Sequence, residues 1–209
     1  MKPYLLPLVL LALFVTAAQA EDVQPLPKVL VIGDSISIGY TPPLTEMLRG
    51  KAEVIHNPGN AAHSAHGLEN LDAWLGDTQW DVIHFNHGLH DLKYVDDTGK
   101  NVSAKEEGHK QIPLEEYAKN LEGIVLRLKE TGAKLIFATT TPFPGNLTNP
   151  VREKADVATY NAAALEIMTK HKVAVNDLCA FAEPRLTELQ IPMNVHFMDI
   201  GSEALAREV

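Results

Sequence analysis

The sequence predicts an α/β fold: a doubly wound, three-layer α/β/α sandwich around a five-stranded parallel sheet. Two observations lead to this prediction. Short apolar runs alternate along the chain with longer segments in which apolar residues recur at helical spacing. Strands that alternate with helices form parallel βαβ units, and the helices then cover both faces of the sheet.

The five strands are the short apolar runs. Residues 29–32 are wholly apolar, as expected of a strand that is buried on both faces. The third run is bounded by turn-forming residues on both sides. The strands are expected at residues 29–32, 52–56, 81–86, 135–139 and 173–175.

The helices follow from apolar spacing and from the positions of proline. Pro42 and Pro43 are typical of a first helical turn, so the first helix is expected to begin there and to end near Arg49. Pro184 is expected to break or kink a partly helical segment at 178–189. Other helices are expected at 64–75, 114–128, 157–168 and 201–209, with a long excursion at 87–112 and a loop at 141–149.

Residues 1–20 have the pattern of a secretory signal peptide. Lys2 gives a positive start, an apolar run covers residues 5–15, and a small-x-small cleavage site ends at Ala20. The apolar run is too short to favour a transmembrane helix, although a retained N-terminal anchor is the alternative. We therefore expect residues 21–209 to form a single exported domain.

The composition excludes several classes of partner. With 18 Lys and Arg against 27 Asp and Glu, the formal net charge is −9, so the chain lacks the basic surface expected for binding nucleic acid or an anionic membrane. Stable membrane insertion after signal cleavage is not expected. Cys179 is the only cysteine, which excludes an intrachain disulfide and a thiolate metal cluster. An exported chain without disulfides fits a bacterial periplasm or the extracellular medium.

Ser35 stands just past the first strand, in VLVIGDSISIGY. Its hydroxyl is either a nucleophile or a helix cap, and a glycine turn after a strand is also a phosphate-binding pattern. The phosphate interpretation is the weakest, because no Gly-Lys-Ser/Thr and no G-x-G-x-x-G pattern follows the strand. A nucleophile would need a base and an oxyanion site.

Other polar residues follow the next two strands. Gly59 follows the second strand in NPGNAAHS, and residues 86–91 follow the third. Ligands of such sheets bind at the carboxyl ends of the strands, so these segments are expected to converge with Ser35. Gly59 either presents a backbone N–H where a side chain would block approach, or makes an ordinary turn.

Histidines offer a base and raise the question of a metal. His196, in IPMNVHFMDIG, precedes the last helix and is either a base or a surface residue. His84, His87 and His90 are spaced by three, which invites a zinc interpretation. That spacing sends strand neighbours to opposite faces and Gly88 interrupts a helix, so zinc is disfavoured. The alternative is that His84 is a hydrogen-bonded strand residue and the later two line a loop.

The order and spacing of these motifs resemble the SGNH (GDSL) hydrolase superfamily over essentially the whole mature chain. The matching motifs are GDS, N-x-G after the second strand, G-x-x-D after the third, and the late histidine. The resemblance implies a flavodoxin-like sheet, with Ser35 as the nucleophile and His196 as the general base. It places the oxyanion hole at the backbone N–H groups of Ser35 and Gly59 and at the side chain of His90.

This sequence departs from the family pattern at two positions. His90 stands where the family has asparagine, and its imidazole adds a titrating group. Met193 stands where an acid usually orients the histidine, and Asn194 or Asp199 are nearby substitutes, the latter expected to cap the last helix. Within the first motif, Ser37 is the competing nucleophile. The residues expected to support the site are Asp34, Asp91 and Asn194.

The resemblance implies a serine carboxylic-ester hydrolase that works through an acyl-enzyme, and the signal-peptide pattern of residues 1–20 predicts that it is exported. O-acetylated carbohydrate is the first substrate class expected, and lysophospholipid or another small ester the second. Two alternatives remain: a non-catalytic carbohydrate- or envelope-binding protein on the same fold, and acyl transfer to a sugar hydroxyl. No metal and no organic cofactor are implied.

Overall fold

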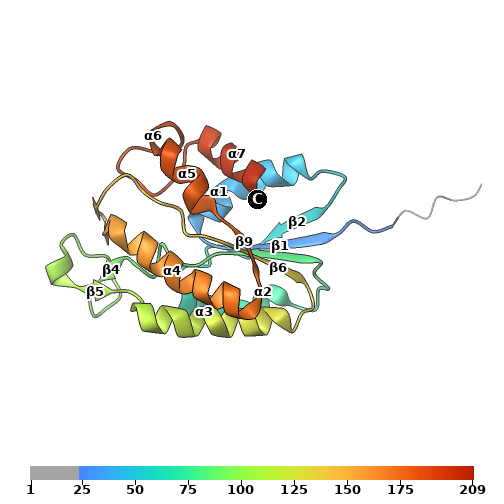
Figure 1. Cartoon of the computed structure of the whole chain (residues 1–209), viewed down its shortest axis with the longest axis horizontal. Helices are drawn as coiled ribbons and strands as arrows, with labels where there is room; N and C mark the ends of the chain where they lie inside the picture. Colours follow the sequence, from blue (N-terminus) through green and yellow to red (C-terminus); the bar gives the residue numbers. More distant parts are fainter. Residues whose placement is uncertain (1–23) are drawn as a thin grey trace, which may run out of the picture.

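The computed structural model describes residues 24–209 and shows the predicted three layers (Figure 1). Five parallel strands form the central sheet in the order β2-β1-β3-β6-β9. This confirms the predicted α/β fold. The strands are β1 Lys28–Ile32, β2 Glu53–His56, β3 Val82–Phe85, β6 Lys134–Ala138 and β9 Ala174–Asn176. The predicted signal peptide at 1–20 lies outside the described residues.

The three central strands are buried because helices cover both faces of the sheet. In β1, Leu30 and Ile32 are at most 1% exposed, and Val31 pairs with His56 of β2 and His84 of β3. Chain order reverses between β1 and β3, which makes this the switch point where doubly wound folds bind ligands. The polar segments that follow these strands therefore lie at one edge of the sheet.

Helices lie on both faces of the sheet (Figure 1). On one face lie α1, α5, α6 and α7, and on the other α2, α3 and α4. Their bounds are α1 Ser35–Met47, α2 Ser64–Leu75, α3 Leu114–Lys129, α4 Lys154–His171, α5 Leu178–Ala182, α6 Leu186–Leu189 and α7 Asp199–Glu208. Pro184 lies in the short 3-10 turn Glu183–Arg185 between α5 and α6, as its predicted breaking effect requires.

The first helix begins earlier than predicted, at Ser35 instead of Pro42. Its N-cap is Asp34, whose carboxylate accepts a hydrogen bond from the Ile36 N–H at 2.9 Å. Pro42 and Pro43 therefore lie inside the helix. The carbonyls that lose a helical donor belong to residues 38 and 39, which are exposed, so water can satisfy them.

The predicted excursion at 87–112 lies outside the main sheet. It contains a small antiparallel pair, β4 Tyr94–Val95 with β5 His109–Lys110, and a 3-10 turn at Lys105–Glu107. The loop predicted at 141–149 also carries part of a second antiparallel pair, β7 Leu147–Thr148 with β8 Val151–Arg152. Both excursions approach the sheet edge that carries Ser35.

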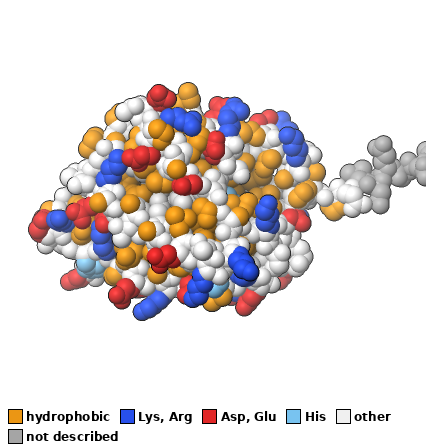
Figure 2. Space-filling view, viewed as in Figure 1, with side chains coloured by type: hydrophobic (Ala, Val, Ile, Leu, Met, Phe, Trp, Pro, Cys, Tyr) orange, Lys and Arg blue, Asp and Glu red, His pale blue; other side chains and the backbone are white. Residues whose placement is uncertain are grey.

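The surface of the described part of the chain is mixed in character. Figure 2 shows acidic and basic side chains interspersed with apolar ones over the visible face. Among residues 24–209, no helix has both the length and the apolar character needed to cross a bilayer.

Candidate active site

Ser35 is the first residue of α1, directly after the turn that ends β1. Because Asp34 supplies the helix cap, the Ser35 hydroxyl is not used for capping. Its Oγ instead lies 2.8 Å from Nε2 of His196, which comes from the loop before α7. Residues that are 161 positions apart in sequence thus meet at the carboxyl end of the sheet.

Asn194 orients the ring of His196. Its side-chain oxygen lies 2.7 Å from His196 Nδ1 and also accepts the His196 backbone N–H at 3.0 Å. An amide oxygen only accepts, so Nδ1 carries the proton and Nε2 is free to accept from the Ser35 hydroxyl. Met193 is 68% exposed, and Asp199 is the first residue of α7 rather than its cap. Asn194 therefore occupies the place of the usual acid.

Ser37, the competing nucleophile, is 2% exposed and already engaged. Its hydroxyl donates to the Asp34 carbonyl at 2.7 Å and lies 2.7 Å from Nε2 of His56. This second serine–histidine pair lies in the wall between α1 and β2. Burial and this hydrogen bond leave Ser35 as the accessible hydroxyl of the GDS turn.

A polar cavity of about 390 Å³ opens on one side of Ser35. It contains predicted site residues from three separate segments, together with others that the sequence did not suggest. The residues that line it are Asp34, Ser35, Asn60, Leu89, His90, Lys93, Asn101, Leu147, Asn149, Pro150, Arg152, Met193, Asn194, Val195 and His196. Both excursions thus form walls of the cavity.

His90 lies in this cavity with Ser35 and His196, as the sequence predicted. Burial, followed by the nearby charges of Lys93 and Arg152, lowers the pKa of His90 to about 3. The ring is therefore neutral near pH 7 and can donate one N–H. The titrating group expected at His90 therefore titrates well below pH 7, because burial disfavours its charged form.

Gly59 does not line this cavity. It has a φ of +69°, as a turn glycine often does, but it borders a separate surface depression with Ile38, Pro42 and His56. The next residue, Asn60, is the one that borders the cavity with Ser35. The lining of the cavity therefore lends no support to an oxyanion role for the Gly59 N–H, and that role stays a prediction.

Asp91 supports the site from behind. It is fully buried, and one carboxylate oxygen accepts the Ser64 N–H at 2.8 Å, which fixes the start of α2 to the segment after β3. Burial raises the pKa of Asp91 to about 7, against the opposing effect of the Ser64 hydrogen bonds. Its expected supporting role is therefore structural in this geometry.

The three evenly spaced histidines have three different surroundings. His84 is buried in β3, with Nδ1 3.4 Å from the Tyr40 hydroxyl, and is the hydrogen-bonded strand residue that one interpretation expected. His87 is also buried, and its ring packs so closely on α2 that a Cβ at Gly67 would lie 2.4 Å from it. Of the three, only His90 lines the cavity, so they do not share a ligand site.

Arg152 is one of the cavity residues that the sequence did not suggest. It is 5% exposed, and its Nε donates to the Leu89 carbonyl at 2.8 Å. Burial lowers the pKa of Arg152 to about 10, and the nearby Asp34 acts in the opposite direction. Burial raises the pKa of Asp34, and Arg152 opposes that shift. No motif surrounds Arg152, and it reaches the site only through the β7–β8 hairpin.

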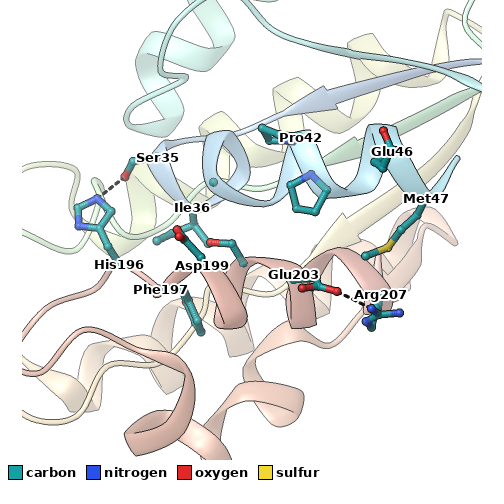
Figure 3. A pocket seen from close by; sticks show the side chains of 13 residues that line it. Ser35, Ile36, Pro42, Glu46, Met47, His196, Phe197, Asp199, Glu203 and Arg207 are labelled. Atoms are coloured by element: carbon teal, nitrogen blue, oxygen red, sulfur yellow. Dashed lines mark hydrogen bonds and ion pairs between the residues drawn. The ribbon is translucent and has the colours of Figure 1, made fainter. Parts of the chain in front are cut away.

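A second, larger groove of about 710 Å³ runs from Ser35 between α1 and α7. Figure 3 shows Ser35 and His196 at one end and Met47 and Arg207 at the other. Apolar side chains on its walls include Ile36, Pro42, Met47 and Phe197. Glu46, Asp199, Glu203 and Arg207 also line the groove, so Ser35 lies where a groove of mixed character meets a polar cavity.

Comparison with known proteins identifies the family. A sequence profile of the GDSL-like lipase/acylhydrolase family matches residues 31–204, which is most of the chain. The chain belongs to this family. The predicted recognition as a GDSL-type esterase is therefore confirmed. No curated protein sequence matches the chain significantly.

Solved structures share the GDSL-type fold at low sequence identity. The acetyl xylan esterase AlAXEase is 17% identical with a TM-score of 0.69, over 87% of this chain and 96% of that one. A lipase/acylhydrolase from Enterococcus faecalis is 21% identical with a TM-score of 0.67, over 88% and 93%. TesA is 18% identical with a TM-score of 0.62, over 87% and 95%.

Proposed function

We propose that this GDSL-type enzyme is an exported serine esterase in which Ser35 and His196 form the catalytic pair. The observation that carries the proposal is the line of contacts from Ser35 Oγ to His196 Nε2 and from His196 Nδ1 to Asn194. It has the order of nucleophile, base and orienting group that nucleophilic catalysis requires. The pair lies open between two cavities that can receive the two halves of an ester.

The mechanism follows from this geometry. Ser35 Oγ attacks the ester carbonyl while His196 Nε2 takes its proton, and His196 then protonates the leaving alkoxide. Water, activated by the same histidine, attacks the acyl-enzyme and releases the acid and free Ser35. The Ser35 N–H lies in the first turn of α1, where N–H groups have no helical acceptor, and is one donor for the oxyanion. His90 is proposed as the second donor.

Acetyl esters of carbohydrates are the first substrate class that we propose. One solved structure with the same fold is an acetyl xylan esterase and another is an acetyl-xylooligosaccharide esterase, which supports this class. The polar cavity has amide side chains suited to hydroxyl groups, from Asn60, Asn101 and Asn149. The groove between α1 and α7 leaves room for longer acyl chains, so chain length is a necessary part of the test.

The test is release of p-nitrophenol from acetyl and octanoyl esters. We expect the parent to hydrolyse at least one ester, and Ser35→Ala and His196→Ala to lose that activity. Ser103→Ala is the matched control, because Ser103 is exposed and lines neither cavity. Activity that persists in Ser35→Ala would disprove the assignment. A folded parent without turnover would favour the non-catalytic binding alternative, and acylated sugar among the products would favour acyl transfer.

Export is proposed on the sequence pattern of residues 1–20. We expect the protein expressed with its own N-terminus in a bacterial host to be recovered outside the cytoplasm, beginning at Glu21. N-terminal sequencing of that material tests this directly. An intact Met1 on protein retained in the cytoplasm would contradict export.

A further inference from the structure

We propose that the cavity between Ser35 and Arg152 is an anion-binding subsite, so that the preferred ester carries a carboxylate or phosphate on its alcohol part. This inference rests on the proposed esterase function and specifies its substrate. Its starting point is the local charge. The chain has a formal net charge of −9, yet two of the residues that line this cavity are Arg152 and Lys93.

Arg152 is buried in the cavity wall, and only the Nε of its guanidinium makes a hydrogen bond within residues 24–209. Its side chain is almost fully buried, and Nε donates to the Leu89 carbonyl. Within residues 24–209, neither of the two outer guanidinium nitrogens, Nη1 and Nη2, donates a hydrogen bond, and the guanidinium forms no ion pair with a carboxylate. A buried cation without a partner is costly, whereas a guanidinium that holds a carboxylate or phosphate makes two parallel hydrogen bonds.

Lys93 adds a second cation to the same cavity. It is half-buried, and across the described residues its ammonium group makes neither an ion pair nor a hydrogen bond. Burial and the neighbouring Arg152 lower its pKa, as expected when two cations share a poorly solvated space. A bound anion would relieve both effects.

Asp34 does not cancel these charges. It is the only carboxylate among the residues that line the cavity, and one of its oxygens is held by the Ile36 N–H. Even when Asp34 is ionised, two cations against one anion leave a net positive charge beside Ser35. The subsite is therefore selective for a negative group on the substrate.

The anion belongs to the alcohol part because the other half of the ester has a different place. The groove between α1 and α7 presents Ile36, Met47 and Phe197, which suit an acyl group. Its charged residues are Glu46, Asp199 and Glu203 with Arg207, so its formal charge disfavours an anionic alcohol. The opposite, polar cavity then receives the alcohol. An acidic sugar and a phosphate-bearing alcohol share the chemistry that Arg152 would recognise.

The first experiment compares three aryl acetates that differ in the alcohol part: 4-acetoxybenzoate, its neutral methyl ester, and 4-acetoxyphenyl phosphate. Each kcat/KM is normalised to the hydroxide-catalysed rate of the same ester. We expect at least about a tenfold preference for an anionic ester over the neutral one, which shrinks as ionic strength rises. The better of the two anionic esters distinguishes carboxylate from phosphate. Equal rates for all three would overturn the inference and leave the esterase function intact.

Variants of the two cations test whether the preference for anionic esters comes from this cavity. We expect Arg152→Gln to reduce the anionic preference about tenfold and Lys93→Met to reduce it less, because the guanidinium is the more buried cation. Lys51→Met is the matched control: it removes a cation from the exposed turn after α1, away from the cavity, and leaves the preference unchanged. A preference that survives in both cavity variants would overturn the inference. If Arg152→Gln does not fold, Lys93→Met decides the question.

A binding measurement separates this inference from the esterase proposal. Calorimetry measures the binding of 4-hydroxybenzoate and of phenyl phosphate to the folded parent and to the cavity variants. Anion binding that is lost in the variants would support the subsite even if the parent hydrolysed no ester. Absence of binding to the parent for both anions, together with no anionic preference, would overturn it.

Discussion

Ser35 is free to pair with His196 because its neighbour Asp34 performs the local structural task. The carboxylate caps α1, and the serine hydroxyl, one residue later, is left without a helical role. The same turn positions the Ser35 N–H at the start of the helix, where the dipole favours negative charge. Asp34 thus starts the helix, and the Ser35 hydroxyl is left available for the chemistry that we propose.

Substitutions of Asn194 test whether its side chain orients His196 or only forms part of the loop. Asn194→Ala removes the acceptor for the His196 Nδ1–H. We therefore expect kcat to fall by at least about tenfold, but by less than the factor of about 10⁴ that a wrong histidine tautomer costs. Asn194→Asp is expected to match or exceed the parent, because a carboxylate also stabilises the imidazolium. Steady-state kinetics with a chromogenic ester measures both, with KM expected to change little.

The matched control for Asn194 is Ile191→Ala. Ile191 is 40% exposed in the same loop and lines neither cavity, so its truncation should leave kcat near the parent value. Parent-like activity in Asn194→Ala would show that the ring is held by other contacts.

Substitutions of His90 test its proposed role as an oxyanion donor. His90→Ala removes a proposed oxyanion donor and is expected to lower kcat by about 10²–10³. His90→Asn keeps an N–H donor and should retain more activity than the alanine variant. Because burial sets the pKa of His90 at about 3, its titration does not shape the pH–rate profile between pH 5 and 8. The pH–rate profiles of parent and His90→Asn should therefore have the same shape, and kcat unchanged in His90→Ala would exclude the donor role.

The elements that form the site are held together by buried polar contacts between their ends. Asn57, after β2, accepts the Gly33 N–H at 2.9 Å, and Ala61 donates to the Gly33 carbonyl at 3.0 Å. Asp91, after β3, accepts the Ser64 N–H that starts α2. These bonds fix the turns after β1, β2 and β3 relative to one another, so the position of Ser35 depends on three elements.

Asp91, which links two of these elements, is expected to make the stability of the fold depend on pH. Burial raises its pKa in the folded protein from 3.8 to about 7, so the folded state holds the proton more tightly than the unfolded state. Between about pH 4 and pH 7, this group therefore lowers the free energy of unfolding as pH rises, by at most about 1.4 kcal/mol per pH unit. Above pH 7 its contribution is constant.

Asp91→Asn lacks this titration but keeps an oxygen that can accept from Ser64. The free energy of unfolding of the variant minus that of the parent should therefore increase as pH rises from 4 to 7. Urea denaturation at several pH values measures the difference. His84 and His87, whose pKa values burial lowers to about 4, act in the opposite direction but are present in both proteins. A difference that does not change with pH would contradict the prediction.

At the scale of the whole molecule, the sequence predicts the sheet better than the site. The strand positions follow from apolar runs, because strands buried on both faces carry that pattern wherever they occur. The predicted start of α1 is wrong because Pro42 and Pro43 fit a first helical turn, whereas the residue that caps the helix is Asp34. Only the structure shows that Asn60, and not Gly59, lines the cavity, since a turn glycine indicates a φ preference but not its position relative to the cavity.

Arg152 could not be found in the sequence for a different reason. It lies in a hairpin more than 100 residues after Ser35, outside every motif, and only the folded chain brings it to the site. Motifs therefore predict which side chains meet at the carboxyl ends of the strands, because their spacing follows the strands. The cavity walls to which we assign substrate selection come from excursions whose paths the sequence does not specify.

The central claim is that Ser35 is the nucleophile, and covalent trapping tests it most directly. The purified protein is treated with a fluorophosphonate, its intact mass is measured, and the modified residue is mapped by peptide sequencing. We expect one adduct per chain, on Ser35, with none on Ser37 and much slower labelling in His196→Ala. An adduct on another residue, or continued ester hydrolysis by protein fully modified at Ser35, would contradict the account.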